Sequence, residues 1–320
     1  MKTYIPKESI LNILQTKTNN RSISFPEYIG FNIKNNTLYM EMIEAKRGND
    51  KVVNSVCDDN MQADNAAFEG WAICIKAWLP EMVDRVCLKW KSPSSNYSPH
   101  YNRFLYRVVR FRETYDWFII DNDLNAIVAE FENKLTSLTN NFGNKEPSKP
   151  NSKGEKYLEY MIVHDHSFEF KKKFKVEYFN HQLPVGVKQN GRSFFTGRGS
   201  AIDLWGLNGD AISIFELKYK HKMVGIITEL FLYTCIIKDM VRGVISPPNS
   251  ANCKRECEKN LYSKIKSIKI IQANMLSEKE YYHDLINKEV IDLLNLQKEE
   301  LTTPKIIYSK YETPEKWLNF

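Results

Sequence analysis

The stretch AIDLWGLNGDAISIFELKYK, residues 201–220, decides the fold and the site that we expect for this chain. Two largely apolar runs flank Asn208-Gly209. Asn-Gly between such runs is a strong hairpin signal, because a type I′ turn needs a positive φ at both of its central residues. The sequence therefore predicts two antiparallel strands joined by a loop of these two residues.

The register of this hairpin determines which side chains share a face. With Asn208-Gly209 as the loop, Ala201 faces Glu216, and side chains alternate between the two faces of the sheet. Asp203 and Glu216 are then diagonal neighbours with centres roughly 7–8 Å apart. Lys218 follows on the same face, so three charged side chains gather there.

These charges also have an ordinary interpretation. Strands carry charges at their ends, and a Lys can pair with a carboxylate across a hairpin for a few tenths of a kcal/mol. However, Asp203 and Glu216 interrupt strands that otherwise read as buried, where an unpaired charge is costly. The apolar context therefore favours a functional site.

The pattern resembles the PD-(D/E)xK nuclease superfamily over about residues 151–240. An Asp stands in a strand after TGRGSAID, residues 196–203, and an ExK motif stands in FELK, residues 215–218. The Pro that precedes the Asp in that family is replaced by Ile202. The resemblance implies a restriction-endonuclease-like core and hydrolysis of phosphodiester bonds.

The resemblance also implies roles for particular residues. Asp203 and Glu216 match the metal-binding acids, and Lys218 matches the catalytic lysine, which would position or activate the attacking water. Hard oxygen ligands suit Mg²⁺, with Mn²⁺ as a substitute, and the main-chain carbonyl of Leu217 could add another oxygen.

Members of the family often carry a Glu on the helix before the core strands, and some carry a Gln four residues before a Tyr on the helix after them. Glu155 and Glu159 in GEKYLEYMIV lie one turn apart on one face, so the sequence does not choose between them. Glu229 and Tyr233 in ELFLY have the second spacing, with Glu in place of Gln.

The first half of the chain contains a similar arrangement, which we keep as an alternative site. A loop of Asn35-Asn36 in SFPEYIGFNIKNNTLYMEMIEAK, residues 24–46, would set Glu27 opposite Glu44, with Lys46 following. This half could be a degenerate duplicate of the core. Its other interpretation is an ordinary amphipathic hairpin in a domain for recognition or partner binding.

Composition and element order indicate the protein class, the domains and the fold class. Of the 320 residues, 42% are hydrophobic and 26% are charged, as in globular proteins. The segment at residues 140–156 reads as a linker, so we expect an N-terminal α+β domain at 1–150 and a nuclease domain at 151–320. The second has the element order of an α/β fold, with a mixed sheet flanked by helices.

Charge and hydropathy suggest the partner and the compartment. The formal net charge is +6, and residues 151–320 hold 26 Lys and Arg against 21 Asp and Glu, which suits a polyanionic partner. No apolar run is long enough to span a bilayer, and we expect a cytoplasmic protein. The leading hypothesis is an endonuclease of double-stranded DNA, by analogy a homodimer, with a role in restriction or defence. The alternatives are an RNase and an inactive nucleic-acid- or protein-binding module of the same fold.

Overall fold

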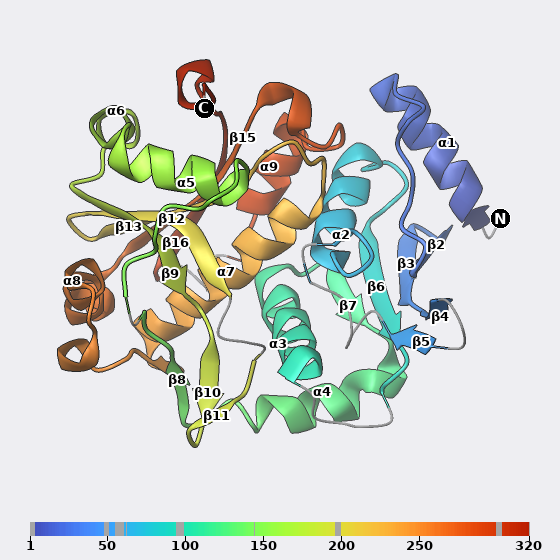
Figure 1. Cartoon of the computed structure of the whole chain (residues 1–320). Helices are drawn as coiled ribbons and strands as arrows, with labels where there is room; N and C mark the ends of the chain where they lie inside the picture. The colour runs from blue at the N-terminus through green and yellow to red at the C-terminus, as the bar shows by residue number, and fades with distance from the viewer. Residues whose placement is uncertain are drawn as a thin grey trace. The chain divides into compact units, whose positions relative to one another are not determined.

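The computed structural model describes residues 4–47, 51–54, 61, 63–93, 99–143, 145–195, 200–298 and 303–319 (Figure 1). The chain divides into two compact units. Unit 1 comprises Met1–Lys134, Met223–Glu229 and His283–Glu299, and unit 2 comprises Leu135–Lys222, Leu230–Tyr282 and Glu300–Phe320.

The division between the units differs from the single boundary expected near residue 150. The first break follows Lys134, because strand β8 (Leu138–Asn140) pairs with β10 (Val187–Gln189) and so belongs to unit 2. The chain then returns to unit 1 twice. Returns of this kind depend on tertiary contacts, which local composition does not report.

Unit 1 is built around a five-stranded sheet of order β1-β2-β3-β6-β7, beside a two-stranded sheet of β4 and β5. Its strands are β1 (Tyr4–Pro6), β2 (Ile29–Lys34), β3 (Thr37–Met42), β4 (Glu44–Arg47), β5 (Lys51–Asn54), β6 (Arg85–Trp90) and β7 (Phe118–Ile120). Its helices are α1 (Lys7–Thr18), α2 (Phe68–Trp78), α3 (Pro99–Thr114), α4 (Asn125–Glu132) and α9 (Lys288–Asn295).

Unit 2 contains a second five-stranded sheet, of order β16-β15-β13-β12-β9, and a four-stranded sheet of order β11-β10-β8-β14. The remaining strands are β9 (Tyr178–Pro184), β11 (Arg192–Ser193), β12 (Ala201–Asn208), β13 (Ala211–Lys218), β14 (Ile245–Ser246), β15 (Ile270–Ser277) and β16 (Lys305–Glu312). The helices are α5 (Glu155–His164), α6 (Ser167–Phe174), α8 (Glu256–Lys264) and most of α7 (Gly225–Arg242). The prediction of an α/β protein with mixed sheets and flanking helices is confirmed.

The two five-stranded sheets share one strand topology. Read from β1 and from β9, each sheet has two antiparallel pairs followed by two parallel pairs. In each, the central hairpin has a two-residue loop, and the first residue after that loop begins the parallel pairing, as Thr37 with Arg85 and Ala211 with Ile270. The sheets differ in where a helix enters, since α1 follows β1 whereas α5 and α6 precede β9.

The hairpin of β12 and β13 forms as predicted, but its loop lies one residue later. Asn208 pairs with Ala211, so the loop consists of Gly209 and Asp210. Gly209 has φ +56°, and Asp210 is not among the residues with positive φ. This is the sign pattern of a type II′ turn, which requires glycine only at its first position. Asn208 is therefore free to stay in the strand.

The shifted loop changes the register that the sequence predicted. Leu204 pairs with Phe215, so the next pair along places Asp203 directly opposite Glu216. The expected pairing of Ala201 with Glu216 is wrong. Both acids still share one face with period two, but they are direct rather than diagonal neighbours, with Cβ atoms typically about 4.5–5.5 Å apart.

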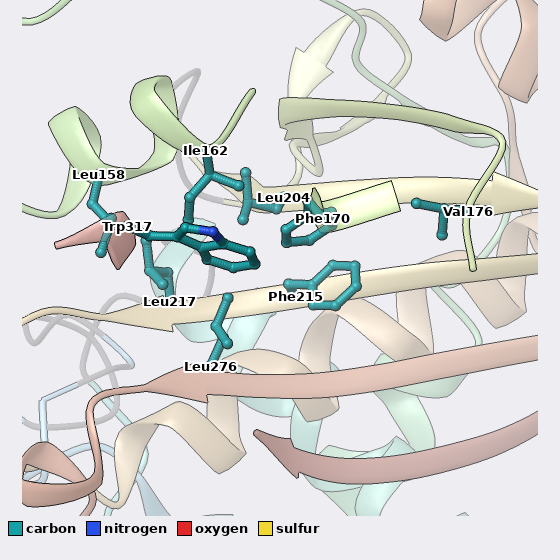
Figure 2. Packing of buried hydrophobic residues seen from close by; sticks show 9 residues of the cluster. All are labelled: Leu158, Ile162, Phe170, Val176, Leu204, Phe215, Leu217, Leu276 and Trp317. Atoms are coloured by element: carbon teal, nitrogen blue, oxygen red, sulfur yellow. The ribbon is translucent and has the colours of Figure 1, made fainter. Parts of the chain in front are cut away.

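One side of this sheet carries a hydrophobic cluster (Figure 2). Leu158 and Ile162 point from α5 toward the strands, and the Trp317 ring lies beside them. The helix α5 packs against β9, β12 and β13. The other members shown are Phe170, Val176, Leu204, Phe215, Leu217 and Leu276. The cluster fixes α5 on the sheet, which matters because α5 also carries Glu155 and Glu159.

Asp64 is a half-buried acid that accepts a hydrogen bond from the residue before α7, and it makes a pH-dependent contribution to stability. The backbone N–H of Val224 donates to Oδ1 of Asp64 at 3.1 Å. Burial raises the pKa of Asp64 to about 6, although the hydrogen bonds from Val224 and Gly225 oppose the rise. Because the folded pKa exceeds the unfolded one, the stabilisation is complete below about pH 4 and is lost as the pH rises through 6.

We therefore expect Asp64→Asn to remove part of the pH dependence of stability. The amide keeps an acceptor for the Val224 N–H but does not titrate. Between pH 4 and pH 7 the wild type should lose about 2 kcal/mol of unfolding free energy relative to the variant. Urea denaturation of both proteins across this range measures the difference, and parallel pH profiles would contradict it.

Candidate active site

The site is built on the opposed acids of β12 and β13. Asp203 is 8% exposed and Glu216 is 2% exposed, so both carboxyl groups are largely removed from water. The backbone N–H of Leu217 donates to Oδ2 of Asp203 at 2.8 Å. This bond holds the Asp203 side chain against β13, just beyond the last regular pair of β12 and β13, which is Leu204 with Phe215. A carboxylate has about four acceptor positions, so one such bond leaves further capacity.

Lys218 forms an ion pair with Glu216. Its Nζ donates to Oε1 of Glu216, and both side chains are buried. The two residues are separated by one position in β13, so they project from the same face. A buried lysine beside a carboxylate keeps its charge compensated. The structure thus places on one face the Glu216 and Lys218 of the ExK motif, with Asp203 opposite Glu216 in the register.

Helix α5 adds a third acid. Glu159 is 2% exposed, and burial, followed by the charge of Asp203, raises its pKa to about 9. In the absence of a cation, Glu159 is therefore protonated at neutral pH. Glu155 instead accepts the N–H of Tyr219 at 3.3 Å, just beyond the end of β13. Of the two candidates that the sequence left open, we carry Glu159 into the proposed site, because the charge of Asp203 contributes to its raised pKa.

Two residues next to Glu159 were not predicted. Nε2 of Gln182 donates to Oε2 of Glu159 at 2.6 Å. Nδ1 of His181 lies 3.9 Å from the same oxygen, and burial, with the charges of Arg255 and His164, lowers the pKa of His181 to about 4. The His181 imidazole and the Glu159 carboxyl group are both neutral at pH 7, so this contact is not an ion pair. No local sequence signal marks either residue.

Glu229 and Tyr233 lie on α7 and are both buried. Glu229 falls in the segment that belongs to unit 1, whereas Tyr233 belongs to unit 2. Their place in the site stays a prediction.

The alternative site in the first half does not have its expected strand geometry. The loop of Asn35-Asn36 is confirmed, with both residues at positive φ. Glu27, however, lies exposed in a turn before β2, and Glu44 begins β4 in another sheet. The side chains of Glu44 and Lys46 lie outside the described part of the structure.

The repeated topology identifies which residues of unit 1 correspond to the acids. Asp203 stands five residues before the end of β12, and Ile29 stands five before the end of β2. Glu216 stands five after the start of β13, and Met42 five after the start of β3. Ile29 and Met42 are paired and buried. An apolar pair therefore occupies the place of the acid pair in unit 1.

The donor set of unit 2 can be tested against Mg²⁺. Among the described residues, no group of three or more His, Cys, Asp and Glu side chains is arranged to hold a metal ion. Mg²⁺ usually retains several waters and takes only one or two carboxylates. The two carboxyl groups of Asp203 and Glu216, which the register places opposite each other, fit that number of ligands. Burial, and after it the charge of Asp203, raises the pKa of Glu159, and a divalent cation bound at Asp203 would oppose the second of these effects.

Comparison of the chain with protein-family models, with curated proteins and with solved structures finds no match. Separately, in the part of the chain that the structure describes, no helix combines the length and the apolar character needed to cross a membrane.

Proposed function

We propose that unit 2 is a Mg²⁺-dependent nuclease with a restriction-endonuclease-like core, which hydrolyses phosphodiester bonds of DNA. The observation that carries the proposal is the buried group of Asp203 opposite Glu216, with Lys218 on the same face and Glu159 electrostatically linked to Asp203. Buried charges cost stability unless they are compensated, and groups of this kind cluster at functional sites.

Asp203 and Glu216 would hold the metal, with the carbonyl oxygen of Leu217 as a further donor. Bound Mg²⁺ would neutralise phosphate charge and favour a hydroxide-like nucleophile at neutral pH, and Mn²⁺ is expected to substitute. The chain contributes the fixed spacing of the two acids, which follows from the register of β12 and β13.

Lys218 is the proposed catalytic cation. Its Nζ is held by Glu216 at the same face, so it is placed to donate a hydrogen bond to an attacking water or to the developing negative charge on phosphate. Lys220, two residues on, is exposed and is expected to have no such role.

DNA is the proposed substrate because the chain carries an excess of positive charge, most of it in residues 151–320. Unit 1 has the same sheet topology without the acid pair, which suits recognition of DNA or of a partner rather than cleavage. Cutting both strands requires two sites, so we propose a homodimer. A role in restriction or defence would follow from a nuclease that carries its own targeting unit.

The test is a cleavage assay on double-stranded DNA, single-stranded DNA and RNA of one sequence, with Mg²⁺, with Mn²⁺ and with EDTA. We expect metal-dependent cleavage of double-stranded DNA. Cleavage confined to RNA would identify an RNase instead. Binding without cleavage under every metal condition would favour an inactive nucleic-acid-binding module of the same fold.

A further inference from the structure

Gln182 has an unusual backbone for a residue within a strand. Its φ is +54°, while its neighbours His181 and Leu183 pair regularly with Leu204 and Ile202 of β12. Gln182 therefore stands at the register position opposite Asp203. A positive φ is uncommon for a residue other than glycine, and such strain persists only where the surroundings enforce it.

Arg255 holds Gln182 in this left-handed backbone conformation. Its guanidinium donates from Nη2 to the carbonyl oxygen of His181 at 2.7 Å and from Nη1 to that of Gln182 at 2.9 Å. Arg255 is 2% exposed and is anchored by Glu258, whose Oε1 accepts from Nη1 at 2.8 Å. The second oxygen of Glu258 accepts the Gly143 N–H at 2.8 Å. A buried, fully bonded clamp thus holds two successive carbonyl groups of β9.

The consequence lies at the Gln182 side chain. A residue with a left-handed backbone conformation departs from the regular pleat. Its side chain therefore need not follow the alternation of side chains between the two faces of the sheet. Here the amide reaches α5 and donates to Glu159 at 2.6 Å. The clamp, the strained residue and the acid form one connected chain of contacts within unit 2.

We propose that Gln182, held in its left-handed conformation by Arg255, is the positioning residue that keeps the Glu159 carboxyl group beside Asp203, so that Glu159 supports the divalent-cation site. This inference rests on the proposed function, because it concerns the same site. It assigns a role to a strand residue and to a buried arginine that no motif in the sequence identified.

The experiment measures Mn²⁺ affinity by titration calorimetry on the full chain. Gln182→Met keeps the length and the unbranched stem but removes the amide donor. Gln189→Met makes the same change in β10, where the amide bonds to the carbonyl of Thr136, and serves as the matched control. Circular dichroism and thermal melting establish that each variant is folded.

We expect Gln182→Met to weaken Mn²⁺ binding about 10- to 100-fold, the usual effect of losing a partner behind the metal ligands. Gln189→Met should bind as the wild type does. The double variant Gln182→Met/Glu159→Gln should bind no more weakly than Glu159→Gln alone, because Gln182 acts through Glu159. A merely structural role for Gln182 would give additive losses.

The outcomes separate this inference from the proposed function. Wild-type binding that is lost in Asp203→Asn but unchanged in Gln182→Met, or additive losses in the double variant, would overturn the positioning role alone. Absence of Asp203-dependent Mn²⁺ binding in the wild type would overturn the metal site and this inference together.

Discussion

Lys218→Met should lose Mg²⁺-dependent cleavage by about 10²–10³-fold, the usual effect of removing one donor that stabilises the transition state. The variant removes the ammonium group but keeps most of the apolar stem. Metal binding should be retained or tightened, because Lys218 would no longer compete for Glu216. Single-turnover cleavage, measured beside Mn²⁺ calorimetry on the same protein, separates these two effects.

The matched control is Lys220→Met, which makes the same change two residues along the chain at an exposed position. It should cleave DNA at the wild-type rate. Equal losses in Lys218→Met and Lys220→Met would indicate a general contribution of positive charge. Unchanged cleavage in Lys218→Met would remove Lys218 from the chemistry.

Glu69→Leu should destabilise unit 1 by about 3–5 kcal/mol, the usual loss when one partner of a buried ion pair is removed. Arg107 donates from Nε to Oε1 of Glu69 at 2.7 Å and from Nη2 to the Ala66 carbonyl at 2.8 Å. Glu69 is fully buried and also accepts from the Thr228 hydroxyl at 3.1 Å. Because a guanidinium does not deprotonate in proteins, Arg107 cannot escape the cost by neutralisation.

The double variant Glu69→Leu/Arg107→Met provides the comparison. Replacing both partners by apolar residues leaves no buried charge, so it should lose much less stability than Glu69→Leu alone. Chemical denaturation of the three proteins measures this difference. A single variant that is as stable as the double variant would show that Arg107 finds other compensation.

Much of the fold was predictable because it rests on local signals. The hairpin of β12 and β13 follows from two apolar runs around a turn sequence, and the loop of Asn35-Asn36 was placed correctly. The loop of Gly209 and Asp210 was missed, because one glycine satisfies either of two turn types.

The sequence indicated the acids of the candidate site but not the residues that support them. ExK spacing and an upstream Asp sufficed to select Asp203, Glu216 and Lys218. The preference for Glu159 over Glu155 rests on the charge of Asp203 acting on Glu159, which depends on how α5 packs on the sheet. The proposed role of Gln182 depends on its positive φ, and that of Arg255 depends on a contact with Gln182, 73 positions away in the chain. Neither feature produces a recognisable pattern in the sequence.

The five-stranded sheets of unit 1 and unit 2 have the same strand topology. At the positions that Asp203 and Glu216 occupy in unit 2, unit 1 has Ile29 and Met42. A shared topology with an apolar pair in place of the acids is what a non-cleaving copy of the core would have. We therefore assign catalysis to unit 2 and recognition to unit 1 as parts of one proposal.

The most direct test of the central claim is cleavage of a supercoiled plasmid in Mg²⁺ by the wild type and by Glu216→Gln, with EDTA as the metal-free control. Glu216→Gln keeps the size of the side chain and an acceptor for Lys218, but removes the charge that would hold the cation. We predict that the wild type cuts the plasmid only with Mg²⁺ and that the variant, although folded, does not cut it. Equal Mg²⁺-dependent cutting by both proteins would contradict the account.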